Sequence, residues 1–305
     1  MELEGIHHVT AITGDAQGNV DFYVGTLGLR MVKKTVNQDD PTVYHLFYGD
    51  EEGHPGADLT FFEYPGEAPG RAGDGMVHTI GWRVGSNDAL DFWEQRLRAA
   101  GVEAERRDEA LRFADPEGLA HELEVYEGAE PPLRADADEI PAEHALLGFA
   151  GVRAYAAEPT AGKPLLADAL GFEEVGTDAW VVAGEERSSY YRYDEPPAQR
   201  GTSGGGTVHH VAFASTIAEH AQWGERAAAA GARPTPVIDR FYFRSIYFRE
   251  PSGVLFEIAT IGPGFTSDEP LESLGERLSL PPDYEHVRER VEATLTPLRN
   301  PRMPR

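Results

Sequence analysis

The sequence predicts an α+β protein of four βαβββ modules that form two curved-sheet barrels. Three observations lead to this expectation. A short strand-like run opens each of four segments in the 305-residue chain, a helical stretch ended by glycine follows each run, and further strand-like runs separated by Gly, Pro and Asp complete each segment. One such module has exposed strand edges, and pairing two modules closes a curved sheet around a cavity.

The four opening runs are mostly rich in β-branched and aromatic residues, which favour strands. They cover residues 5–10, 76–81, 149–153 and 207–213. A helix is expected after each run, at residues 19–27, 87–100, 163–170 and 217–230. Glycine comes directly after all four stretches, as is common where a helix ends in the left-handed conformation.

The closing hairpins of the second and fourth modules match closely. Residues 115–122 align with residues 250–257, and both segments place a glutamate four residues after a turn glycine, at Glu122 and Glu257. The first module has Thr60 at this slot, and the third module has no clear counterpart.

The modules suggest a division of the chain into four parts. Modules 1 and 2 occupy residues 1–129, a connector rich in Pro, Asp and Ala follows at 130–145, and modules 3 and 4 occupy 146–261. The C-terminal extension, 262–305, contains a helix from about residue 282 to 295 with apolar residues four positions apart. This helix packs either on the core or on a neighbouring subunit, and we expect a homo-oligomer.

Composition limits the partners and ligands of the chain. The formal net charge of −25 disfavours nucleic acid, and its spread along the chain is typical of adaptation to high salt. Without cysteine, a metal site must use nitrogen or oxygen ligands. No apolar run approaches the ~18–20 residues that span a bilayer, and no secretory signal is evident, so we expect no membrane association and a cytoplasmic location.

The candidate metal ligands come from the alignment of the four modules. The second position of the opening histidine pair holds His8 in module 1 and His210 in module 4, whereas modules 2 and 3 have Thr79 and Gly151 there. With Glu257, these histidines form the two-histidine, one-carboxylate set of non-haem iron sites, which leaves positions open for a substrate oxygen and dioxygen. If all three bind one ion, modules 1 and 4 must share the metal cavity, and modules 2 and 3 must pair with each other.

The other histidines are weaker candidates for metal ligands. His78 and Glu122 are too few for a second metal site, since one imidazole and one carboxylate rarely hold an ion. His45 lies in a strand-like run and is expected to be structural or to line the pocket.

With His8, His210 and Glu257 at these positions, the chain resembles members of the vicinal oxygen chelate superfamily, which includes glyoxalase I and the type I extradiol dioxygenases. Within it, the chain is most similar to ring-cleaving dioxygenases that act on para-hydroquinones. The resemblance runs from Ile6 to about Leu280, and it is carried by residues 5–10, 44–46, 55–56, 208–213, 239–240, 247, 253–257, 264–266 and 273–275.

The resemblance implies an Fe(II) enzyme, or an Mn(II) enzyme, that inserts both atoms of O2 into a small aromatic diol or hydroquinone. It places the metal ligands at His8, His210 and Glu257, and further active-site residues at His7, Thr10, His209, Arg240 and Tyr247.

Chemistry gives these further residues roles. Arg240 can hold an anionic oxygen, and Tyr247 and a neutral histidine can exchange protons. His7 and His209 immediately precede the two histidine ligands, so strand alternation aims them away from the pocket unless the strand twists. A supporting role outside the pocket therefore stays open for both.

Two other functions also stay open. One is a glyoxalase I-type lyase, which usually needs a fourth protein ligand and would require a glutamate at the Thr60 slot. The other is a metal-free small-molecule binding protein of the same fold.

Overall fold

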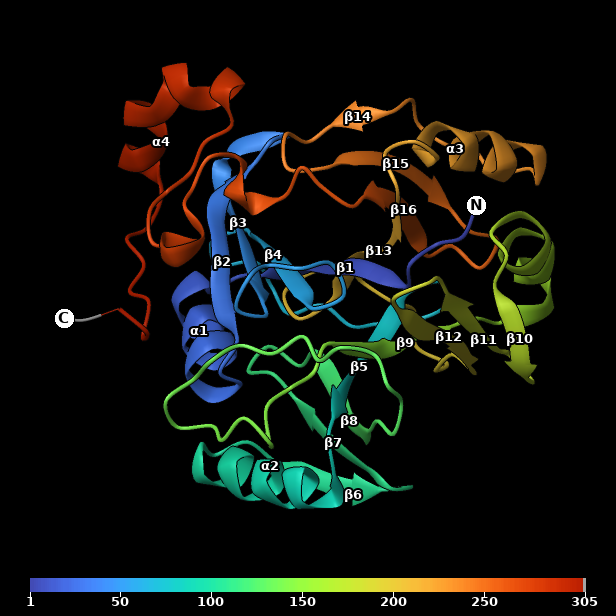
Figure 1. Cartoon of the computed structure of the whole chain (residues 1–305), viewed down its shortest axis with the longest axis horizontal. Coiled ribbons are helices and arrows are strands. Elements are labelled where there is room, and N and C mark those ends of the chain that lie inside the picture. The colour runs from blue at the N-terminus through green and yellow to red at the C-terminus, as the bar shows by residue number, and fades with distance from the viewer. Residues whose placement is uncertain (304–305) are drawn as a thin grey trace.

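The computed structural model describes residues 1–303 and contains two eight-stranded mixed sheets (Figure 1). The first sheet joins the strands of modules 1 and 4. Its strands, in order across the sheet, are β14 (Ile238–Asp239), β15 (Arg244–Arg249), β16 (Leu255–Thr260), β13 (Val208–Ser215), β1 (Ile6–Thr13), β4 (Asp58–Glu63), β3 (Asp40–Gly49) and β2 (Arg30–Asn37).

The second sheet joins the strands of modules 2 and 3. Its strands, in order, are β10 (Glu173–Gly176), β11 (Ala179–Ala183), β12 (Ser188–Asp194), β9 (Phe149–Tyr155), β5 (Val77–Val84), β8 (Ala120–Val125), β7 (Ala110–Ala114) and β6 (Ala104–Arg107). The central pair of each sheet is antiparallel, β1 with β13 and β5 with β9. The predicted α+β fold and the pairing of module 1 with module 4 are therefore confirmed.

Strand register shows which residues are equivalent in the four modules. In each module the last strand runs parallel to the first. The position equivalent to Glu257 on the last strand pairs with the residue two positions after the one equivalent to His8 on the first strand. This pairing joins Thr10 with Thr60, Gly81 with Glu122 and Ala212 with Glu257. In module 3 it joins Arg153 with Arg192, so Arg192 fills the slot for which the sequence pattern showed no counterpart.

The helices differ from expectation in their boundaries and, in modules 1 and 3, also in their helix type. The first is α1 (Ala16–Val20), followed by a π-helical turn at Asp21–Thr26, and the second is α2 (Asn87–Ala99). Module 3 has a 3-10 turn at Pro159–Gly162 and a π-helical turn at Pro164–Ala169 instead of an α-helix. In module 4, α3 (His220–Ala229) begins three residues later than predicted, and Glu219 before it makes no side-chain capping hydrogen bond. The four glycines after these helices have φ of 73°, 77°, 76° and 92°.

The C-terminal extension packs on the first sheet. After 3-10 turns at Phe265–Ser267, Leu271–Ser273 and Pro282–Val287, α4 (Arg288–Thr294) contacts β3 (Figure 1). Val291 and Leu295 join the chain's own hydrophobic core. Of the two packing positions considered for this helix, the structure therefore shows the one on the core, and the homo-oligomer stays a prediction.

Two further expectations concern chain division and location. The proposed module boundaries near residues 129, 145 and 261 all lie between strands, and the division stays a proposal. Within residues 1–303, no helix has the length and apolarity needed to cross a membrane. The cytoplasmic location stays a prediction.

Candidate metal centre

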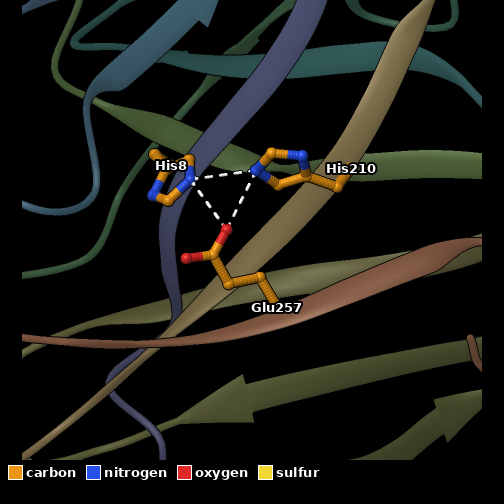
Figure 2. Close-up of side chains that lie close together, drawn as sticks. All are labelled: His8, His210 and Glu257. Atoms are coloured by element: carbon orange, nitrogen blue, oxygen red, sulfur yellow. Dashed lines mark hydrogen bonds and ion pairs between the residues drawn. The ribbon is translucent and has the colours of Figure 1, made fainter. Parts of the chain in front are cut away.

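Three adjacent strands of the first sheet bring His8, His210 and Glu257 together (Figure 2). His8 lies on β1, His210 on β13 and Glu257 on β16, and all three side chains are buried. The two Nε2 atoms are 3.2 Å apart, and Glu257 Oε2 lies 3.3 Å from His8 Nε2 and 2.9 Å from His210 Nε2. Within residues 1–303, this is the only group of three or more such side chains whose donor atoms converge closely enough for one metal ion.

The hydrogen bonds of His7 fix the proton on His8. His7 Nε2 lies 3.2 Å from the carbonyl oxygen of Thr260, and a carbonyl only accepts, so Nε2 carries the hydrogen. His7 Nδ1 is then an acceptor, and it receives the Nδ1–H of His8 at 2.9 Å. His8 Nε2 therefore has a free lone pair directed at the centre of the site, as a metal ligand requires.

Glu257 adds a buried negative charge to the site. Burial raises the pKa of its carboxyl, but the neighbouring His8 and His210 lower it, and the resulting pKa lies well below the usual value. Neither carboxylate oxygen accepts a geometrically satisfactory hydrogen bond from the described residues. Since a buried carboxylate without donors is strongly destabilising, the geometry fits a cation bound by two nitrogens and one oxygen.

His7 and His209 lie beside the ligands that follow them. His209 Nδ1 is 2.8 Å from His210 Nδ1, which repeats the contact between His7 and His8. Loss of hydration lowers the pKa of His7 to about 3 and the pKa of His209 to about 4, and the positive charge of the adjacent histidine acts in the same direction. The pairing of β1 with β13 shifts register between Ile6 and His8, and such a bulge re-aims a side chain. This bulge accounts for the position of His7, and a second register shift, between Thr10 and Ala11, lies at His209, whose side chain is exposed. Each of the two rings contacts the Nδ1 atom of the candidate ligand that follows it.

Thr10 belongs to a chain of hydrogen-bonded polar side chains on β1, β4 and β3. Its Oγ1 lies 2.7 Å from Thr60 Oγ1, which lies 3.0 Å from His45 Nε2. Thr60 therefore forms hydrogen bonds at the slot where module 4 has the Glu257 carboxylate.

Arg240 and Tyr247 are on the β15 side of the site. Tyr247 pairs with Glu257 across β15 and β16. Its ring packs edge to face against the ring of His210, with the ring centres 5.7 Å apart. The Arg240 guanidinium is 5.6 Å from the Tyr247 ring centre and bonds both oxygens of Asp39 at 2.9 and 3.1 Å. Burial and Glu257 raise the pKa of Tyr247, so the phenol stays protonated. Burial lowers the pKa of Arg240, but Asp39 and Tyr247 raise it above its usual value.

A small cavity of about 40 Å³ adjoins these residues. Phe243 lies against His7 and His8, with ring centres 5.2 Å apart in both pairs. The cavity is smaller than the ~150 Å³ of a protein cavity known to hold benzene. An aromatic substrate therefore requires movement of this wall, where Gln38 Nε2 bonds the Arg240 carbonyl at 2.8 Å.

The equivalent hollow on the second sheet has different chemistry. At about 820 Å³ it is much larger, but Glu122 there is paired with Arg112 at 3.2 Å and with Arg153 at 3.8 Å. His78 bonds Asp194 at 2.9 Å. Because Arg112 and Arg153 already neutralise the Glu122 carboxylate, this hollow does not provide a second metal site.

Two contacts were not predicted from the sequence. Asp39 is separated from Arg240 by 201 positions, and the link from Thr60 to His45 crosses between two strands. The second link follows from alternation once β3 and β4 are paired, but no local pattern indicates the first.

Comparisons with known proteins concern nearly the whole chain. A family model described as the Glyoxalase/Bleomycin resistance protein/Dioxygenase superfamily matches residues 5–123 and 134–258. A Bacillus subtilis (strain 168) protein provisionally named ring-cleaving dioxygenase MhqA is 41% identical, over 98% of this chain and 100% of that protein. Chlorohydroquinone/hydroquinone 1,2-dioxygenase of Sphingobium indicum is 34% identical over 96% of each chain.

Solved structures show the same fold. A Bacillus subtilis structure provisionally described as a dioxygenase aligns with a TM-score of 0.92 and 40% identity, over 99% of both chains. Glyoxalase I from Zea mays shares the fold at a TM-score of 0.58 and 13% identity, over 84% of this chain and 92% of that one. The chain belongs to the glyoxalase/bleomycin resistance protein/dioxygenase superfamily.

Proposed function

We propose that the chain is a ring-cleaving dioxygenase that opens a hydroquinone- or catechol-type ring with O2, in an extradiol-type reaction. Its metal is a mononuclear non-haem Fe(II), with Mn(II) as the alternative, held by His8, His210 and Glu257. The observation that supports this most directly is the convergence of two buried imidazole nitrogens and a carboxylate oxygen within 2.9–3.3 Å, with no other donor to the carboxylate among residues 1–303. Full-length relatives named as ring-cleaving and hydroquinone dioxygenases point to the same chemistry.

Fe(II) held by His8, His210 and Glu257 would supply a Lewis acid for a substrate oxygen and a path for electrons from the substrate to dioxygen. Side chains of the protein beside the metal position would provide a positive charge and hydrogen-bond donors. Arg240 stabilises an anionic oxygen of the substrate, because its guanidinium stays charged next to the site. Tyr247 Oη is a protonated donor at the same wall, and Thr10 Oγ1 offers a further hydrogen bond. Phe243 covers the histidines and keeps water from them.

The geometry favours a three-ligand site over a glyoxalase-type one. A fourth carboxylate ligand would occupy the Thr60 slot, where Thr60 instead bonds Thr10 and His45. A metal-free binding protein is also disfavoured, because it would leave the buried Glu257 carboxylate without a cation.

Oxygen consumption by protein loaded anaerobically with iron tests the proposal. We expect one O2 consumed per hydroquinone or catechol opened, and no loss of a hemithioacetal. Glu257→Gln should abolish uptake, whereas Glu122→Gln, at the equivalent slot of module 2, should leave it within about twofold because this residue lies on the other sheet. Absence of O2 uptake with every diol would exclude the dioxygenase.

A further inference from the structure

His45 is held rigidly at the wall of the small cavity. On β3 it lies opposite Phe62 of β4, and its ring lies 4.4 Å from that of Phe62 and 4.0 Å from that of Phe47. Its Nε2 shares a hydrogen bond with Thr60 Oγ1 at 3.0 Å. These contacts fix the plane of the ring and use one of its two nitrogens.

The other nitrogen is free for a ligand. Among the described residues, no group forms a hydrogen bond with His45 Nδ1, and the side chain is partly accessible and lines the cavity. Its cross-strand neighbour on β2 is Thr35, and directly opposed residues present their side chains on the same face. Thr35 is 2% exposed and lines the same cavity. Its Oγ1 lies near the Tyr242 hydroxyl but makes no hydrogen bond of satisfactory geometry with the described residues.

Aromatic rings connect this polar pair to the metal ligands. Phe62 contacts the ring of His45 and lies 6.4 Å from the ring of His210, while Phe243, which lines the cavity, packs against His8. An aromatic ring entering between these walls would have one edge toward the ligands and the opposite edge toward His45 and Thr35.

We propose that His45 Nδ1 and Thr35 Oγ1 form the subsite for the ring hydroxyl that the metal leaves free, and that this subsite selects para-diols. The inference rests on the proposed function. In a catechol both oxygens are on neighbouring carbons and both reach the metal. In a hydroquinone the second oxygen projects from the far side of the ring, where burial without a hydrogen bond would be unfavourable.

Anaerobic calorimetry on the iron-loaded full chain tests the subsite without turnover. The probes are hydroquinone and 4-methylphenol, which replaces the second hydroxyl with a methyl group. Wild-type protein should bind hydroquinone about tenfold more tightly, as one net hydrogen bond to a buried group predicts. His45→Phe should reduce this preference to about unity.

Three variants separate the subsite from a structural role. His45→Asn places an amide near the Nδ1 position and should restore most of the preference, whereas His45→Gln replaces Nε2 and should not. Thr35→Val should reduce the preference even if His45→Phe fails to fold. The matched control is His286→Phe, which changes an exposed histidine of the C-terminal extension and should keep the full preference.

Two outcomes would overturn the inference while leaving the dioxygenase intact. One is equal affinity of the wild type for both phenols while it consumes O2 with hydroquinone. The other is an unchanged preference in both folded His45→Phe and Thr35→Val. Absence of O2 uptake by the wild type with any diol would instead remove the proposed function on which the subsite depends.

Discussion

Replacing His7 tests whether it prepares His8 for the metal. In the wild type, the Thr260 carbonyl sets the tautomer of His7, and His7 in turn accepts the Nδ1–H of His8 at 2.9 Å. His7→Phe removes this acceptor inside a site where both histidines are only 2–3% exposed. The metal-free His8 can then move its proton to Nε2 and donate it to Glu257 Oε2, 3.3 Å away. That tautomer blocks the metal.

The size of the effect follows from the hydrogen bond. Binding a metal would force the His8 proton back to Nδ1, where it has no acceptor, and an unsatisfied buried donor costs about 1–3 kcal/mol. This corresponds to a loss of roughly 5- to 150-fold in metal affinity, in the range of ~10–100-fold typical of groups that orient metal ligands.

Competition with a chromophoric chelator for Fe(II) or Mn(II), under anaerobic conditions at neutral pH, measures this loss. The matched control is His220→Phe, since His220 Nε2 donates to the Ile258 carbonyl at 2.8 Å without contacting a ligand. That variant should lose stability but keep wild-type metal affinity. If His7→Phe bound the metal as tightly as the wild type, the tautomer argument would be refuted.

Three more predictions concern the ion pairs and a second buried histidine. Lys33→Met should lower the free energy of unfolding in denaturant by about 3–5 kcal/mol, because buried Glu269 loses its nearest cation and keeps Arg277 at 3.8 Å; a drop below ~1 kcal/mol would contradict this. Trp82 Nε1 donates to His121 Nδ1, and burial lowers the pKa of His121 to about 3, so its contribution to stability is complete above pH 6.5 and is lost as pH falls toward 3. Titrations of unfolding free energy should show a slope in that range that is shallower in His121→Gln by up to about 1.4 kcal/mol per pH unit, and equal slopes would oppose it. Arg240→Ala should reduce kcat/KM by ~10²–10³, whereas Asp39→Ala, whose side chain is 73% exposed, should change it less than about fivefold; similar losses would show that the pair acts as a unit.

The fold and the convergence of His8, His210 and Glu257 could be predicted because both depend on local spacing. Strand alternation and turn glycines set the module period, and equivalent positions in a repeated unit occupy equivalent places in the sheet. His8, His210 and Glu257 therefore converge once β1, β13 and β16 lie side by side. The pairing of module 1 with module 4 followed from requiring these three side chains to reach one ion.

The remaining features depend on long-range packing. Arg192 could not be aligned because only the register of β12 with β9 shows its slot. The position of His7 depends on a bulge between β1 and β13, and Asp39 meets Arg240 only after the β2–β3 turn reaches the β14–β15 loop. The π-helical turns at Asp21–Thr26 and Pro164–Ala169 differ from α-helices by one residue in the spacing of their hydrogen bonds, which apolar spacing over so few residues does not distinguish.

The two sheets carry a buried glutamate at equivalent positions, Glu257 and Glu122, but in the described part of the chain only one of the two is paired with arginine. This difference supports a metal site at Glu257. A buried carboxylate needs a compensating cation. On the second sheet the chain provides it, since Glu122 has Arg112 and Arg153 within 4 Å. On the first sheet, within residues 1–303, neither Lys nor Arg pairs with Glu257, and Arg240 is bonded to Asp39 instead. His7 keeps the proton of His8 on Nδ1, away from Glu257. The site therefore fits a bound cation as the source of its compensating charge.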